Sequence, residues 1–283
     1  MPYALVATTV YNSSTTGGTF ADSLAANSGD NVAVAAFNDS AGGGARIKEA
    51  WAMDSTHACE IEMIYTRPDS THDQQHGVRF QVPALYPAGS AGKAGAHSLL
   101  PGPSNISVFK NDSPQILVTS TASDAVAMTY LTEYDDLPGA QAQFIDPTTA
   151  YSLRKSNLSF YVNAVASGTA GLYGAARVLN ADDDRFHGNT WYAILGYSVQ
   201  VPVLTIALAG PETGAYKIAG PGGALNLDNT FYFLEQSLRY GQPLIPVFNS
   251  ANKSNWNVYV VDTAASTAPK VNFNCLELTG SPV

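Results

Sequence analysis

Histidine and carboxylate side chains are the first candidates for chemistry in this chain of 283 residues. His72 and His76 stand four positions apart, with Asp73 beside the first, a spacing that could hold a metal ion on one face of a helix. The segment 69–77 is polar, however, and lies between two segments with strand character. We therefore favour an exposed loop here and keep the metal site as the alternative.

A second group of side chains offers oxygen donors that could bind calcium. The group comprises Asn180, Asp182, Asp183 and Asp184. Asp135 and Asp136 form a shorter and weaker set. A solvated turn before Phe186 accounts for the same composition, and we favour that turn. No other metal or cofactor is indicated, so calcium stays the one alternative to a protein without cofactors.

Known catalytic patterns are absent from the sequence. It has no G-x-S-x-G, phosphate-binding loop, H-E-x-x-H or C-x-x-C pattern. The stretch Gly220-Pro221-Gly222-Gly223 lacks the strand, loop and helix context of a phosphate site, and it predicts a turn. Trp51, Trp191 and Trp256 fall on or beside predicted strands, where core packing is favoured over a sugar-stacking surface. We expect no catalytic residues and no enzyme activity.

The chain has two cysteines, Cys59 and Cys275. A secreted scaffold stabilised by disulfides would carry more, so we expect two unpaired thiols. The residues that follow Met1 lack the basic region and apolar core of a signal peptide, and no apolar run approaches the length of a membrane span. These features predict a protein that folds in a host cytoplasm.

Strand patterns dominate the rest of the chain. Residues 60–65 and 78–82 alternate polar and apolar side chains with a period of two, which is typical of half-buried strands. Short strands separated by Gly, Pro and Asn predict an all-β fold of sandwich type. One helix is expected, with Phe231, Leu234 and Leu238 at helical spacing. Asp228 or Asn229 would cap it, and Gly241 would end it.

The same order of patterns occurs twice along the chain. The interval from Ala50 to Ala193 equals the interval from Pro68 to Pro211. Further on, the interval from Pro114 to Pro243 equals the interval from Tyr130 to Tyr259, and this second interval is shorter than the first. Such repetition indicates a duplicated β-domain, with a shorter loop in the second copy. We predict one domain over 1–140 and another over 150–283. The junction is expected between Asp135 and Asn157, where the stretches 137–139 and 146–149 break the chain.

Composition limits the function. Charged residues make up 13% of the chain, the net charge is −9, and the sequence pI is about 4.8. An acidic chain lacks the basic surface that nucleic-acid binding requires, so we expect no direct nucleic-acid binding. A surface of neutral Ser, Thr and Asn groups favours close contact with protein neighbours, because few ions need to be desolvated.

The duplicated pattern resembles the double jelly-roll major capsid proteins of tailless icosahedral bacteriophages that contain an internal membrane. The resemblance covers nearly the whole chain. It depends on the paired Pro68 and Pro211 turns, the paired strands at Val78-Arg79-Phe80 and Tyr216-Lys217-Ile218, and the paired prolines Pro114 and Pro243. It implies two tandem eight-stranded jelly rolls and homotrimers that present six sandwiches as a pseudo-hexagonal tile of the shell. Some members bind calcium, but no residue here matches a ligand pattern.

The expected function is therefore that of a major capsid protein in a virion. Its partners would be further copies of itself, other virion proteins and, as a further candidate, an internal membrane. Residues 84–104 and the N-terminal segment 3–20 are the expected contact regions, ordered on assembly. The alternative is a phage decoration or adhesion module with lectin-like carbohydrate binding. A third class is an enzyme on a cupin or glycosidase scaffold. A cupin would need clustered His and Glu ligands from the strands, whereas the histidines here are expected mostly in loops.

Overall fold

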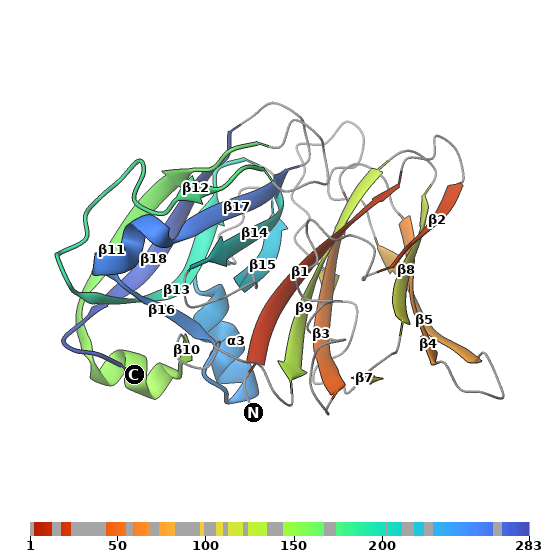
Figure 1. Cartoon of the computed structure of the whole chain (residues 1–283), viewed down its shortest axis with the longest axis horizontal. Helices are drawn as coiled ribbons and strands as arrows, with labels where there is room; N and C mark the ends of the chain where they lie inside the picture. The colour runs from red at the N-terminus through yellow and green to blue at the C-terminus, as the bar shows by residue number, and fades with distance from the viewer. Residues whose placement is uncertain are drawn as a thin grey trace.

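The computed structural model of the chain is built mainly from antiparallel β-sheets with few helices (Figure 1). It describes the strand backbone of the first half and, in most positions, both backbone and side chains of the second. The described residues are 3–12, 18–23, 44–54, 59–67, 74–82, 97–98, 106–109, 113–120, 124–134, 144–166, 174–201, 203–210, 218–223, 229–262 and 268–282.

The first half contributes two sheets. One has the order β1-β9-β3-β6, with β7 also paired to β3, and the other has the order β2-β8-β4-β5. The strands are β1 (Tyr3–Asn12), β2 (Gly18–Ser23), β3 (Gly44–Asp54), β4 (Cys59–Arg67), β5 (Gln74–Val82), β6 (His97–Ser98), β7 (Ile106–Phe109), β8 (Ser113–Ser120) and β9 (Asp124–Tyr134).

The second half also contributes two sheets, with the orders β10-β16-β13-β18-β11 and β12-β17-β14-β15. We call the first of these the five-stranded sheet. The strands are β10 (Phe144–Ile145), β11 (Arg154–Asn163), β12 (Arg177–Val178), β13 (Trp191–Val199), β14 (Val203–Ala209), β15 (Ile218–Gly223), β16 (Ile245–Asn249), β17 (Asn257–Asp262) and β18 (Lys270–Leu278). Two helices, α2 (Pro147–Ser152) and α3 (Tyr232–Tyr240), and a 3-10 helix η4 (Ser250–Asn255) complete it.

The two halves share their strand order. Counted from β1 and from β11, the first strand pairs with the last and the last pairs with the third. The second strand pairs with the next-to-last, which pairs with the fourth. Each sheet draws its strands from one half only, while β1, β3 and β9 contact β14 and β15 of the other half (Figure 1). The domain limits 1–140 and 150–283 stay a prediction.

The structure corrects one part of the predicted repeat. Pro114 lies on β8 and Pro243 lies just before β16, yet β8 corresponds in pairing order to β17. The interval from Pro114 to Asn257, the first residue of β17, equals the interval from Pro68 to Pro211. The longer interval, the one from Pro68 to Pro211, therefore continues to relate equivalent strands in this region. The shorter interval, from Pro114 to Pro243, relates strands that are not equivalent. Proline marked the wrong strand because it can stand at or just before the start of many strands and does not identify which strand follows.

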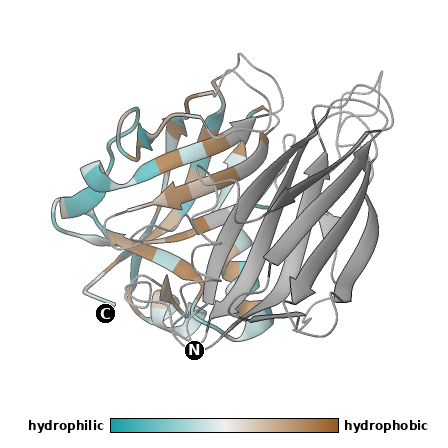
Figure 2. Cartoon of the chain, turned by 45° about the vertical axis from the view of Figure 1, so that its right-hand side comes forward, coloured by the Kyte–Doolittle hydropathy of each residue, from teal (hydrophilic) through white to brown (hydrophobic). Residues whose placement is uncertain are grey.

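The core of the second half lies between its two sheets. The fully buried Trp256, Tyr192, Tyr197, Phe248 and Phe273 are its largest members. Tyr192, Tyr197 and Phe248 lie on β13 and β16, which are buried on both faces, and Phe273 lies on the part of β18 where buried and partly buried residues alternate. Trp256 follows η4 directly before β17. Figure 2 shows hydrophobic residues along the strands of this half. The burial of Trp256 confirms its predicted core role, and Trp191 packs partly buried on the other face of the five-stranded sheet.

The expected helix is confirmed in place but differs in orientation. Gly241 ends α3 in the left-handed region, with φ of 63°. Phe231 occupies the N-cap position without a side-chain hydrogen bond, so the predicted Asn229 cap is wrong; Asp228 lies outside the described residues. Tyr232, Phe233 and Gln236 form the buried side of α3, whereas Phe231 and Leu238 are exposed. The aromatic pair at 232 and 233 buries more apolar area than the predicted stripe.

Three further expectations are wrong. Asp146 and Pro147 begin helix α2, because an Asp N-cap followed by Pro at the first helical position favours a helix start. The stretch 220–223 forms most of strand β15, paired with β14, and is not a turn. Residues 3–12 form β1, paired with β9 along its whole length. The β-branched residues of this segment satisfy their backbone in a sheet, so most of the predicted N-terminal arm is a strand.

Candidate interaction surface

The outer face of the five-stranded sheet, the face turned away from the second sheet, packs against α2 and against the Leu234 side of α3, whereas Tyr232 and Phe233 of α3 belong to the core between the sheets. The apolar residues of the outer face form a separate small cluster that includes Ala193, Leu195, Leu276, Ala150 of α2 and the partly buried Leu234 of α3. Both helices are short, and α2 has only 6 residues. Because two short helices cannot cover five strands, part of this face remains open.

Helix α2 is fixed by its first residue. The carboxylate of Asp146 accepts hydrogen bonds from the backbone N–H of Thr149 at 3.0 Å and from the Thr149 hydroxyl at 2.7 Å. The hydroxyl hydrogen bond is the main cause of a lowered pKa for Asp146. The helix buries Ala150 and leaves Tyr151 at its solvent side. This cap therefore positions the Tyr151 ring at the edge of the sheet.

The start of helix α3 is fixed by a glycine and two aromatic residues. A Cβ on Gly196 would lie 2.5 Å from the carbonyl oxygens of both Asn229 and Thr230, so only glycine allows this approach. A β-bulge in β13 lies between Ile194 and Gly196. Tyr232 and Phe233 then contact the ring of Tyr197 with ring centroids 5.9 Å away in each case. Phe231, one position earlier, stays 44% exposed on the outer face.

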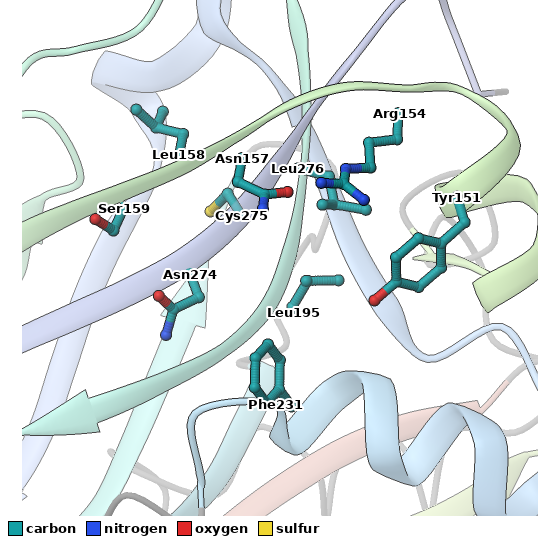
Figure 3. Close-up of a pocket in the computed structure, with 10 residues that line it drawn as sticks. All are labelled: Tyr151, Arg154, Asn157, Leu158, Ser159, Leu195, Phe231, Asn274, Cys275 and Leu276. Carbon is teal, nitrogen blue, oxygen red and sulfur yellow. The ribbon is translucent and has the colours of Figure 1, made fainter.

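Between α2, β11 and the start of α3 lies a pocket of about 400 Å³, which we call the α2–α3 pocket (Figure 3). The guanidinium of Arg154 and the hydroxyl of Tyr151 both point toward its middle, and the Phe231 ring stands at the start of α3 (Figure 3). Its lining is Tyr151, Arg154, Asn157, Leu158, Ser159, Leu195, Phe231, Asn274, Cys275 and Leu276.

Cys275 contributes little chemistry to this pocket. Its thiol is free and buried, which agrees with the predicted lack of a disulfide to Cys59. Burial raises the pKa of the thiol, and a thiol that stays protonated is a poor nucleophile. The pocket therefore offers one cation, amide and hydroxyl groups and apolar surface, a set suited to binding.

Arg154 differs from its neighbours in having no carboxylate partner in the part of the chain that the structure describes. Lys155 donates to Glu277 at 2.7 Å, Arg177 to Asp182 at 2.7 Å and Arg185 to Asp183 at 2.8 Å. Arg154 is exposed and begins β11 at a register shift between Arg154 and Ser156. The shift separates Arg154, which lines the pocket, from Lys155, which turns toward Glu277.

Glu277 is the one buried carboxylate among the described side chains. It accepts hydrogen bonds from Lys155 at 2.7 Å and from the Ser156 hydroxyl at 2.6 Å, and its oxygen lies 2.8 Å from His187 Nδ1. Lys155 is the main cause of the low pKa of Glu277, about 2, with Ser156 next. This network ties β18 to β11 and to the loop before β13. Its role is structural, because the buried carboxylate holds together side chains from three segments of the chain.

The predicted calcium group is taken up by ion pairs. Asp182 binds Arg177 and accepts from the Asn163 backbone, while Asp184 binds Lys253 and accepts from Asn180. Each of these carboxylates has its own cation, so the oxygens do not converge on one point. Within the described residues, no group of three or more His, Cys, Asp or Glu side chains could hold a metal ion.

The remaining candidates lie largely beyond what the structure describes. His72, Asp73, Asp135 and Asp136 are outside the described residues, as is most of the segment 84–104. His76 lies on β5, which begins at Gln74, so the expected loop ends earlier than predicted and the helical spacing of His72 and His76 does not apply. None of the helices in the described part of the chain has the length and hydrophobicity to cross a bilayer.

Sequence reasoning missed the α2–α3 pocket. Tyr151 and Arg154 lay in a segment interpreted as a domain junction, and Phe231 was assigned to a buried helix face. One signal was available: Asp146 and Pro147 together mark a helix start, which would have placed Tyr151 on a helix directly before a strand.

Comparison with known proteins gives distant structural neighbours. No protein-family model matches the chain, and no curated protein matches its sequence. The exported protein XepA of PBSX aligns with 10% identity and a TM-score of 0.27, over 95% of this chain and 86% of the other. The major capsid protein P2 of bacteriophage PM2 aligns with 9% identity and a TM-score of 0.24, over 98% of each chain. Because these TM-scores are low, neither neighbour carries a function over to this chain.

Proposed function

We propose that this chain is a major capsid protein whose two halves are each an eight-stranded jelly roll. The observation that carries the proposal is the strand order. Counted from β1 and from β11, the first strand pairs with the last and the second with the next-to-last in each half, so the chain passes between two facing sheets in the manner of a jelly roll. Jelly rolls of this kind build viral capsids and also lectin domains.

Duplication supports a role in a closed shell. Three copies of a two-sandwich chain place six similar sandwiches around a threefold axis, and such a tile can pack with hexagonal neighbours. The low charge content, 13% of residues, reduces the cost of burying large surfaces between copies. In this proposal the protein folds in the host cytoplasm, acts in the virion with other copies and other virion proteins, and needs neither catalytic residues nor a cofactor.

The lectin-like alternative has less support. Sugar binding commonly uses an exposed aromatic platform, but Trp256 is fully buried and Trp191 is partly buried under the outer cluster. The exposed aromatic side chains of the described second half are Tyr151 and Phe231, beside Arg154. A guanidinium next to aromatic rings suits a carboxylate better than a neutral sugar.

The oligomeric state tests the proposal. Light scattering coupled to size-exclusion chromatography should give trimers at micromolar concentration, and negative-stain microscopy should show pseudo-hexagonal tiles or shells. A protein that remains monomeric at all concentrations and binds a glycan saturably would overturn the capsid proposal in favour of the lectin-like one.

A further inference from the structure

We propose that the α2–α3 pocket binds an acidic segment of a second copy of this chain, with a carboxylate of that copy on Arg154. The inference rests on the proposed function, since a capsid protein has its own copies as neighbours. It adds to that function the surface used and the chemistry of the contact.

Charge identifies the partner. The chain carries 23 acidic and 14 basic residues, so on a second copy acidic side chains outnumber basic ones. In the described second half, Lys155, Arg177, Arg185 and Lys253 each bind a carboxylate, and Lys270 lies 3.8 Å from the centre of the Tyr161 ring. Arg154 has neither a carboxylate nor an aromatic ring as a partner among the described residues. An acidic chain is therefore complementary to its own copy at this point.

Apolar surface identifies the place. Four large apolar side chains are exposed among the described residues, and two of them, Tyr151 at 46% and Phe231 at 44%, line this pocket. The buried Leu195 and Leu276 form its floor. A volume of about 400 Å³ is large enough for a few side chains, so the occupant should present an acidic residue beside an aliphatic or aromatic one. Arg and aromatic residues around such a pocket are typical of the centre of an interface.

The surroundings also favour a carboxylate. The amides of Asn157 and Asn274 add polar groups to the lining. Glu277, which follows Leu276 on β18, is bound by Lys155, Ser156 and His187. It therefore does not compete for Arg154.

Photo-cross-linking tests the contact directly. A photoreactive phenylalanine analogue replaces Tyr151 in the full chain, and the protein is mixed with an isotopically labelled copy before irradiation. We expect cross-links between labelled and unlabelled peptides, with the captured peptide containing Asp or Glu. Cross-links confined to one chain would overturn the inference.

A matched pair of variants tests the charge. Arg154→Ala and Arg185→Ala each remove one exposed arginine, but only Arg154 lines the pocket. We expect Arg154→Ala to weaken association about tenfold or more, and Arg185→Ala to change it less than about twofold. If the parent chain assembles and both variants match it, this inference fails and the capsid proposal stands. If the parent chain is monomeric throughout, the capsid proposal fails first and the inference with it.

Discussion

The two faces of the five-stranded sheet differ in what covers them. The inner face packs against a complete second sheet, and its residues Tyr192, Tyr197 and Phe273 are at most 1% exposed. The outer face packs against two short helices and keeps a pocket with Tyr151 and Phe231 at its rim. Both faces come from the same strands, since Ile194 and Leu195 are adjacent but belong to different clusters.

The difference indicates which face serves the fold and which is open to a partner. An inner residue has all its apolar area covered by its own chain, so its loss should cost stability wherever it lies. An outer residue near the pocket has area left uncovered, so its loss should affect association more than folding. The free energy of unfolding of the second half can be measured by tryptophan fluorescence in a Trp51→Phe background. In that background the remaining tryptophans, Trp191 and Trp256, both lie in the second half.

Phe273→Ala tests the inner face and should have the largest effect. Phe273 is fully buried and stacks on Phe160 with ring centroids 5.2 Å apart. Removing the ring leaves a cavity between two sheets that cannot close, at a cost of about 3–5 kcal/mol. Urea titration should show a lower midpoint for the second half. An effect below about 1 kcal/mol would mean that the two sheets do not enclose this position.

Glu277→Gln tests the polar end of the inner face. Glu277 shares a face of β18 with Phe273 and Cys275 because side chains alternate along a strand. Its pKa in the folded chain, about 2, lies below the ordinary value of 4.5. The carboxylate therefore contributes stability above pH 4.5, and that contribution is lost as the pH falls from about 4.5 to about 2.

The expected size follows from the same shift. A pKa unit corresponds to about 1.4 kcal/mol, but Lys155 and His187 are 54% and 70% exposed, and water screens them. We expect Glu277→Gln to cost about 1–3 kcal/mol at pH 7 and to flatten the loss of stability at acid pH. Urea titrations at neutral pH, near the ordinary carboxyl pKa and below it measure both effects. An unchanged acid profile would remove Glu277 from the network.

Gly196→Ala tests the junction between the two faces. The added methyl group would lie against the carbonyl oxygens of Asn229 and Thr230, so the start of α3 must shift at a cost of about 1–3 kcal/mol. Phe231 would move with it and the α2–α3 pocket would change shape. We expect reduced stability together with weaker association. Gly188→Ala is the control, because a Cβ there meets nothing within 4 Å.

The contrast between the faces also explains what could be predicted from the sequence. Alternation at residues 60–65 and 78–82 predicted strands β4 and β5, because a period of two leaves only one way to bury an apolar face. The equal intervals from Ala50 to Ala193 and from Pro68 to Pro211 predicted a duplicated β-domain with like topology, because the copies of a repeat keep the order of their strands. Gly241 predicted the end of α3, since a left-handed cap favours glycine.

The outer face could not be predicted in the same way. Phe231, Leu234 and Leu238 fit a helical stripe, but Tyr232 and Phe233 offered a larger apolar surface, and tertiary packing selected it. The pocket combines Tyr151 and Arg154 with Phe231 from a distant segment, and no local pattern encodes that proximity. The ion pairs of the acidic group at 182–184 could not be predicted from its local composition, because the cations that neutralise it come partly from a distant segment. Those cations are Arg177, Arg185 and Lys253.

Leu234→Ala and Leu238→Ala compare two leucines one turn apart on α3 and should give the smallest effects. Leu234 is partly buried and packs on the outer cluster, while Leu238 is 64% exposed. The first substitution should cost about 1–2 kcal/mol, because only part of its apolar area leaves water, and the second less than about 0.5 kcal/mol. Neither residue lines the α2–α3 pocket, so we expect Leu238→Ala to leave association, measured by light scattering, nearly unchanged.

A stability loss from Leu238→Ala equal to that from Leu234→Ala would show that α3 buries a side other than that of Tyr232 and Phe233. A loss of association at Leu238 with stability unchanged would extend the contact surface from the pocket along the helix.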